Sequence, residues 1–166
     1  MDNIIKNMNC FVDGRGYAGH VTELTPPKLT IKTDEHQAGG MDTPIQIDMG
    51  MEKIEATFIL TKYDPEVLKL FGVVDSNTTR FTFRAAAQSE DNKVTPIILE
   101  MSGKLKEIDR GTWKPAEKAT TTFNIALDYY KETIDGQVII EIDVKNMKRI
   151  INGTDRLADM RSALGM

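Results

Sequence analysis

The chain has 166 residues, the size of one domain with a substantial core. Its 21 basic and 25 acidic residues give a net charge of −4, so no overall positive field favours nucleic acid or an anionic membrane surface. Apolar residues never run longer than three, far short of the roughly 20 needed for a transmembrane helix. The first residues lack the basic and apolar regions of a secretory signal. We therefore expect assembly in a cytoplasm, with no membrane anchor.

Most of the chain alternates apolar and polar residues with a period of two, which is typical of strands with one buried face. After Phe11 and Val12, the turn-like residues 13–16 predict a hairpin whose second strand covers residues 17–24. A further strand is expected at residues 28–33, beyond two prolines. These patterns indicate a mainly β protein.

The segment 34–50 breaks this pattern, because it contains glycine and methionine and has little periodicity. Long irregular segments in small domains are usually functional or interfacial. We therefore expect a projecting loop or hairpin at residues 34–50 of the single domain 1–166.

The next elements are a strand at residues 52–61 and a short helix. In the helix, Asp64 is the expected N-cap, Pro65 the first residue and Gly72 the end. Val67, Leu70 and Phe71 have the spacing of one apolar helix face.

A hairpin is expected from residues 80–88 and 95–107, joined by the polar turn 89–93. Gly103 lies inside the second strand, where glycine often marks a bulge or a close approach of another backbone. Trp113 follows in a turn-rich segment, and we expect it to anchor its loop on the core or on a partner.

The longest alternation covers residues 120–133 and places Leu127 and Tyr129 on one face. One ring of Tyr129 and Tyr130 should therefore be buried while the other reaches the surface. Asp135 and Gly136 predict a tight turn into a strand at 138–143. A second helix is expected at residues 154–164, with Leu157, Met160 and Leu164 on one side.

Residues that carry chemistry are few and scattered. Cys10 is the single cysteine, and His20 and His36 lack metal-ligand partners at short spacing. Gly39 and Gly40 are not followed by the Lys-Ser or Lys-Thr of a phosphate loop. The acidic residues near them lack the spacing of a calcium loop. We expect no cofactor, no metal site and no catalytic residue.

Short sequences spread over nearly the whole chain resemble the major tail tube protein of contractile phage tails, the family that includes the tubes of R-type pyocins. The most specific are AGGMD at 38–42 and IDMGME at 47–52. The others are, in order, 11–14 (FVDG), 24–29 (LTPPKL), Pro44, 71–72 (FG), 106–107 (KE), 113–114 (WK), 118–119 (KA), 129–131 (YYK), 135–136 (DG), 141–143 (EID), 151–153 (ING) and 164–165 (LG).

This resemblance implies a β-sandwich or half-barrel that closes into hexameric rings, which stack into a hollow tube inside a contractile sheath. Four strands from each of six subunits, spaced about 4.8 Å and tilted about 40°, would close at a backbone diameter of roughly 50 Å. The implied partners are further copies of the chain, the sheath protein, and baseplate or initiator, tape-measure and terminator proteins. DNA would pass through the tube without specific binding, and the location would be the virion tail.

In this interpretation the segment 34–50 contacts neighbouring subunits, in the same ring or in the next. We expect its apolar side chains to pack on those neighbours and its glycines to permit close backbone approach. The candidate interface residues are Gly39, Gly40, Met41, Asp42, Pro44, Ile45, Ile47, Asp48 and Met49.

Two alternatives remain open. The tube could belong to a headless injection machine, such as an R-type bacteriocin or an effector-delivery device. The chain could also be a monomeric ligand-binding or hydrolytic β-barrel.

The polar strand faces carry five basic and three acidic residues, so we expect some of these faces to point away from any bore. The eight residues are Lys53, Arg80, Arg84, Lys104, Lys106, Glu55, Glu100 and Asp128.

Overall fold

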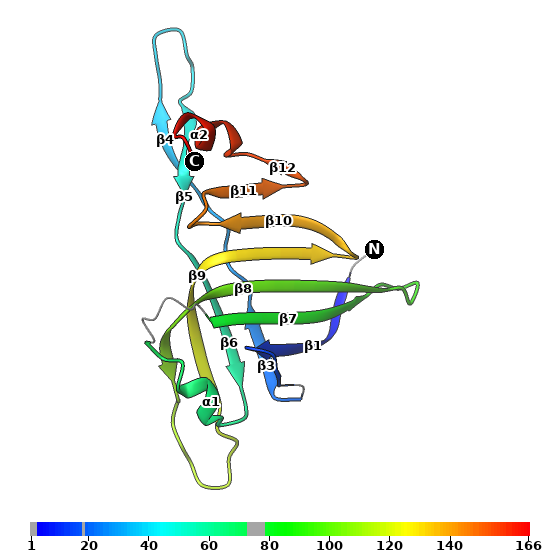
Figure 1. Ribbon diagram of the computed structural model, residues 1–166. Helices are drawn as coiled ribbons and strands as arrows, with labels where there is room; N and C mark the ends of the chain where they lie inside the picture. The colour runs from blue at the N-terminus through cyan, green and yellow to red at the C-terminus, as the bar shows by residue number, and fades with distance from the viewer. Residues whose placement is uncertain (1–2, 18, 73–78) are drawn as a thin grey trace.

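The computed structural model describes residues 3–17, 19–72 and 79–166. Ten antiparallel strands form one sheet, and a two-stranded hairpin stands apart from it (Figure 1). The strands are β1 (Ile4–Val12), β2 (Arg15–Gly16), β3 (Val21–Thr25), β4 (Ile31–His36), β5 (Ile45–Met51), β6 (Ile54–Leu60), β7 (Thr79–Gln88), β8 (Val94–Asp109), β9 (Thr121–Ile134), β10 (Gln137–Asp143), β11 (Lys148–Ile151) and β12 (Thr154–Asp155).

The long strands β8 and β9 bend, so that the one sheet folds into two layers (Figure 1). The first half of β8 lies between β7 and the second half of β9, in the order β12-β11-β10-β9-β8-β7-β1-β2. The first half of β9 stays paired with the second half of β8, but on its other side it pairs with β6 rather than with β10. Strand β6 in turn pairs with β3. We call the first set the main layer, and β3, β6 and the paired halves of β8 and β9 the second layer.

The bend coincides with a bulge at Gly103. The register moves from Ser102 opposite Tyr129 to Gly103 opposite Leu127, which leaves Asp128 as the extra residue. A Cβ on Gly103 would lie 2.9 Å from the carbonyl carbon of Ala126 and closer still to its oxygen. The predicted close approach at Gly103 is confirmed. At this point one side of β9 changes its partner from β10 to β6.

The core lies between the two layers and is rich in phenylalanine. Phe58 from the second layer stacks on Phe123 at 5.0 Å between ring centroids and meets Phe83 edge-on at 5.5 Å. Alternate residues of β6 are buried, as the period-two pattern predicts. Burial of these rings joins the two layers.

The predicted hairpin near the N-terminus is only partly correct. Residues Arg15 and Gly16 do turn back along β1, and Asp13 and Gly14 have the positive φ angles of a tight turn. Of the expected strand 17–24, Tyr17 still lies beside β1, since its N–H donates to the Cys10 carbonyl at 2.8 Å. Strand β3, which begins at Val21, pairs with β6 in the second layer instead. Ala18 in that predicted strand lies outside the described residues. The expected strand at 28–33 begins later, at Ile31.

Both helices are shorter than expected. Helix α1 (Pro65–Leu68) begins as predicted, with the Asp64 carboxylate accepting from the Glu66 N–H at 3.0 Å. It ends before Phe71, which bridges to Leu105 and is 54% exposed. The placement of Phe71 on a buried helix face is therefore wrong.

Helix α2 (Ala158–Ala163) also covers only part of its predicted range of 154–164. Thr154 and Asp155 form strand β12 against β11 instead. On the predicted apolar side of this helix, Leu157 is partly buried, but Met160 (54%) and Leu164 (62%) are exposed.

The bulge at Asp128 also corrects the placement of Tyr129. It shifts the alternation by one residue, so Tyr130 enters the core whereas Tyr129 lies on the opposite face. Burial, together with a hydrogen bond from its hydroxyl to Glu141 at 3.1 Å, raises the pKa of Tyr129 to about 12. The turn at Asp135 and Gly136, with positive φ at both residues, is confirmed.

Candidate subunit interface

Strands β4 and β5 form a hairpin that projects beyond the main layer (Figure 1). We call residues 31–51 the arm. Almost all of its side chains are exposed, and none of the fully buried core residues lies within it. The arm thus covers the predicted segment 34–50, as a hairpin with a register rather than as an irregular loop.

The two faces of the arm differ. Ile45 (52% exposed), Ile47 (45%) and Met49 (58%) alternate with Asp48 and so lie on the face opposite to it. The Asp48 carboxylate accepts from Arg149 of β11 at 2.9 Å, which ties that side of the arm to the main layer. The apolar side chains therefore point away from the Asp48–Arg149 ion pair and are about half exposed.

The same tie acts on the charge of Asp48. Its pKa is lowered, first by the Gly50 N–H, which donates to the carboxylate at 2.8 Å, and then by the Arg149 guanidinium. Asp48 is therefore ionised, as the pairing with Arg149 requires.

The tip of the arm holds the remaining predicted interface residues. Gly40 has φ +88° and the Met41 N–H donates to the Ala38 carbonyl, so these residues make a tight turn. Met41 is partly buried in this turn, whereas Gly39, Asp42 and Pro44 are exposed. Neither glycine has another atom within 4 Å of an added Cβ, so no close approach occurs within the chain.

The main layer ends in edges that the chain leaves largely unpaired. Among the described strands, the outer edge of β1 pairs with β2 at Phe11 and Val12, and the Tyr17 N–H adds a hydrogen bond to the Cys10 carbonyl. Near its other end Ile4 is 57% exposed and Ile5 is 54% exposed. The opposite edge is the two-residue strand β12. Open edges with exposed apolar residues are suited to pairing with another chain.

A second exposed apolar patch lies at the end of the molecule away from the arm. There Trp113, 65% exposed, meets the Tyr63 ring edge-on at 5.7 Å. Arg110 donates to the Tyr63 hydroxyl at 3.0 Å. Of the two expectations for Trp113, an anchor on the core is wrong, because the indole is mostly exposed.

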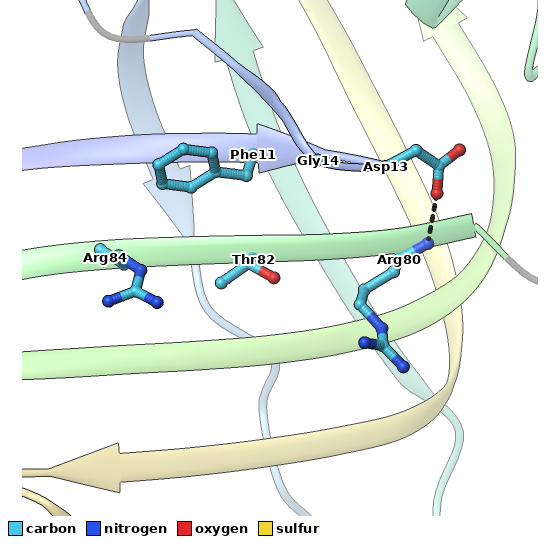
Figure 2. A pocket seen from close by; sticks show the side chains of 6 residues that line it. All are labelled: Phe11, Asp13, Gly14, Arg80, Thr82 and Arg84. Carbon is cyan, nitrogen blue, oxygen red and sulfur yellow. Dashed lines mark hydrogen bonds between the residues drawn. The ribbon is translucent and has the colours of Figure 1, made fainter.

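The outer face of the main layer is polar and of mixed charge. Arg80, Thr82 and Arg84 of β7 share this face, as Figure 2 shows for the shallow depression beside Phe11. Across the sheet, Thr82, Glu100, Lys131 and Glu141 stand opposite one another in register. Glu55 and Lys106 instead pair with each other on the second layer. The two sets of charged strand residues therefore lie on different layers of the subunit, and the expectation that some of them point away from a bore stays a prediction.

Within residues 3–17, 19–72 and 79–166, no group of three metal-ligating side chains is found. Neither helix there is long and apolar enough to cross a membrane.

Comparison with known proteins identifies the family. The family model described as "Phage tail tube protein FII" matches residues 2–165. The chain belongs to this tail tube family. The tail tube protein of Escherichia phage P2 is 29% identical over 170 residues, covering 100% of this chain and 99% of the relative. The major tail tube protein of Serratia phage KSP20 is 30% identical over 159 residues, covering 94% and 92%.

Solved structures confirm the fold class. The extended sheath-tube complex of the extracellular contractile injection system PVC contains a chain with a TM-score of 0.58 and 7% identity, covering 76% of this tail tube chain and 87% of that one. Hcp1 from Flavobacterium johnsoniae has a TM-score of 0.50 and 16% identity, covering 80% and 97%. The anti-feeding prophage baseplate contains a third, with a TM-score of 0.51 and 11% identity, covering 76% and 90%.

Sequence reasoning located the arm of this tail tube protein but missed other parts of the candidate interface. The β1 edge from Ile4 onward was not predicted, because its apolar residues do not alternate regularly with polar ones. The strand β11, which supplies Arg149, was also missed. Its four residues are too short for a periodicity signal.

Proposed function

We propose that this chain is the repeating subunit of hexameric rings that stack into the tube of a contractile phage tail. Its role is structural, as expected for its family. The subunit would contribute rigidity and a continuous bore to the tube. It would use no catalytic residue and no cofactor.

The observation that carries this proposal is the incomplete edge of the main layer. Strand β1 has nine residues, but β2 covers only two of them on the outer side. Joining this edge to the β11–β12 edge of the next copy would satisfy backbone groups on both chains. Repetition of this head-to-tail contact closes a ring when the rotation is one sixth of a turn.

The polar face of the main layer suits the lining of such a bore. Arg80, Arg84 and Lys131 lie among Glu100 and Glu141, so positive charge is largely offset within the face. A nearly neutral wall would let duplex DNA pass without holding it. The apolar core face of the same strands is already used to join the two layers.

The proposed partners are the sheath around the tube and the baseplate, initiator, tape-measure and terminator proteins at its ends. The proposed location is the virion tail, assembled in the cytoplasm of a bacterial host. The phage reading is favoured over a headless injection machine by the two curated relatives, which are phage proteins similar over nearly their whole length. Capsid genes beside this gene would support it.

The arm provides the direct test. Deletion of residues 38–49 leaves the pairing of Ile31 with Met51, and it removes none of the buried core. We expect a folded, soluble subunit with the far-ultraviolet circular dichroism of a β protein that forms no tubes in negative-stain electron microscopy.

The control is Lys93→Glu in the exposed β7–β8 turn, which should still form tubes. Normal tubes from the deletion variant would contradict the interface role of the arm. An unmodified chain that stays monomeric in sedimentation at every concentration would contradict the tube function and favour a monomeric ligand-binding or hydrolytic β-barrel.

A further inference from the structure

The apolar patch around Trp113 is exposed in the single chain. Residues 110–118 connect β8 to β9 and are all exposed. We call this segment the Trp113 loop. The edge-on contact of Trp113 with Tyr63, and the hydrogen bond from Arg110 to the Tyr63 hydroxyl, hold the indole in a defined position. An ordered, exposed tryptophan is typical of the centre of a protein–protein contact.

The arm and the Trp113 loop have opposite charge. The arm holds one lysine and four acidic residues, a net charge of −3 with histidine neutral. The Trp113 loop holds Arg110, Lys114 and Lys118 against Glu117, a net charge of +2. On the arm, Asp34 stands opposite Ile47 in the β4–β5 register and so lies on the apolar face, and Asp42 lies at the tip. Each surface thus combines exposed apolar side chains with charges that complement the other.

These two surfaces cannot meet within one molecule, because they lie at opposite ends of it (Figure 1). The arm extends past the β12 edge of the main layer, and the Trp113 loop lies at the end nearer the β1 edge. A head-to-tail contact that brings the β11–β12 edge of one copy towards the β1 edge of another therefore brings these two ends towards each other.

We propose that the Trp113 loop, with Tyr63 beside it, is the surface on which the arm of a second copy of this chain docks. The apolar face of the arm, Ile45 and Ile47, packs on the indole of the second copy. Asp34 and Asp42 lie near its Lys114 and Lys118. The proposal rests on the proposed function, since it names the receiving surface for the interface arm.

Charge reversal tests the pairing. The loop variant Lys114→Glu/Lys118→Glu and the arm variant Asp34→Lys/Asp42→Lys should each raise the protein concentration needed for tube assembly by about tenfold or more. The combination of all four substitutions should restore assembly. A matched control, Lys28→Glu/Lys93→Glu, makes the same change in net charge at exposed sites outside both surfaces and should assemble normally. Loss of assembly in this control, or no rescue in the combination, would overturn the proposal.

A cysteine pair tests the contact itself. Chains carrying Ile47→Cys are mixed with chains carrying Lys114→Cys, assembled and oxidised; the native Cys10 is fully buried and does not compete. We expect a disulfide-linked two-chain band on a non-reducing gel, which the control pair Ile47→Cys with Lys93→Cys should not give. Linkage to the control position, or no linkage in assembled tubes, would overturn the inference.

The two hypotheses fail in different ways. If the unmodified chain forms no tubes, the proposed function fails and the docking contact fails with it. If unmodified tubes form and the loop variant assembles equally well, only the docking inference fails. A loop variant with normal tubes that no longer binds sheath would show that the Trp113 loop receives the sheath protein instead.

Discussion

Replacement of Gly103 by alanine would place a methyl group where the backbone of β9 already lies. The added Cβ would be 2.9 Å from the Ala126 carbonyl carbon and 2.9 Å from the Leu127 Cα, and nearer still to the Ala126 oxygen. These are backbone atoms of a strand that pairs on both sides, with β8 and with β6. Neither side chain rotation nor a small local shift can remove the clash.

The expected loss in free energy of unfolding for Gly103→Ala is therefore at the upper end of overpacking effects, about 3 kcal/mol. With a urea m-value of about 2 kcal/mol per M, the midpoint should fall by roughly 1.5 M. The assay is urea unfolding of dilute subunit followed by far-ultraviolet circular dichroism, because the exposed Trp113 is a poor reporter of the core.

The matched control is Gly39→Ala at the arm tip. Gly39 is exposed and an added Cβ there meets no atom within 4 Å, so its midpoint should change by less than the equivalent of about 0.5 kcal/mol. If Gly103→Ala unfolds at the same urea concentration as the unmodified chain, the backbone approach at the bend does not constrain this fold and the reasoning is refuted.

Three further predictions concern the core, the buried thiol and the arm. Phe58→Ala removes the ring that contacts Phe123 and Phe83, and should lower the free energy of unfolding in urea by about 3–5 kcal/mol. Phe71→Ala, at an exposed site, should change this free energy little. Equal effects of the two substitutions would contradict the assigned core. Burial raises the pKa of the Cys10 thiol to about 12. The native chain should therefore not react with a thiol reagent at pH 8, whereas the unfolded chain should react. Rapid labelling of the native chain would contradict the burial of Cys10. Asp48→Asn should reduce amide hydrogen-exchange protection in the arm at neutral pH, because it removes the charge paired with Arg149. The folded-state pKa of Asp48 is lowered, so the pairing with Arg149 is present above the ordinary carboxyl pKa of about 3.9 and is lost as pH falls through the lowered value. In the unmodified chain, amide hydrogen-exchange protection in the arm should decrease over that pH range. In Asp48→Asn it should not change with pH over the same range.

The β character, the strand faces and several turns follow from local patterns in the sequence. The alternation in β6, the N-cap at Asp64 and the positive-φ turn at Asp135 and Gly136 each depend on neighbouring residues alone. The position of the arm was also predictable, because a break in periodicity is local. Its hairpin register was not, since residues 37–44 between β4 and β5 form a longer connection than the two- to five-residue loops whose turn type fixes the register.

Other features depend on contacts between residues far apart in the chain. Strand β3 does not pair along β1 because β6, which is distant in the sequence, provides its partner in the second layer. Helix α1 ends at Leu68, and Phe71, three residues later, bridges to Leu105 of the distant strand β8. Similarly, the tie between Asp48 and Arg149 joins side chains that are 101 positions apart. Sequence periodicity contains no information about such pairings.

The sequence by itself determined that this is a β protein with one polar and one apolar side to most strands, and its motifs were sufficient to identify the family. Only the tertiary structure decided where β8 and β9 bend, which charged residues share a face, and that Trp113 and the arm lie at opposite ends of the molecule. The physical reason is that the side-chain period and turn preferences are set by a few neighbouring residues. Strand partners and the relative positions of surfaces are set by the packing of the whole chain.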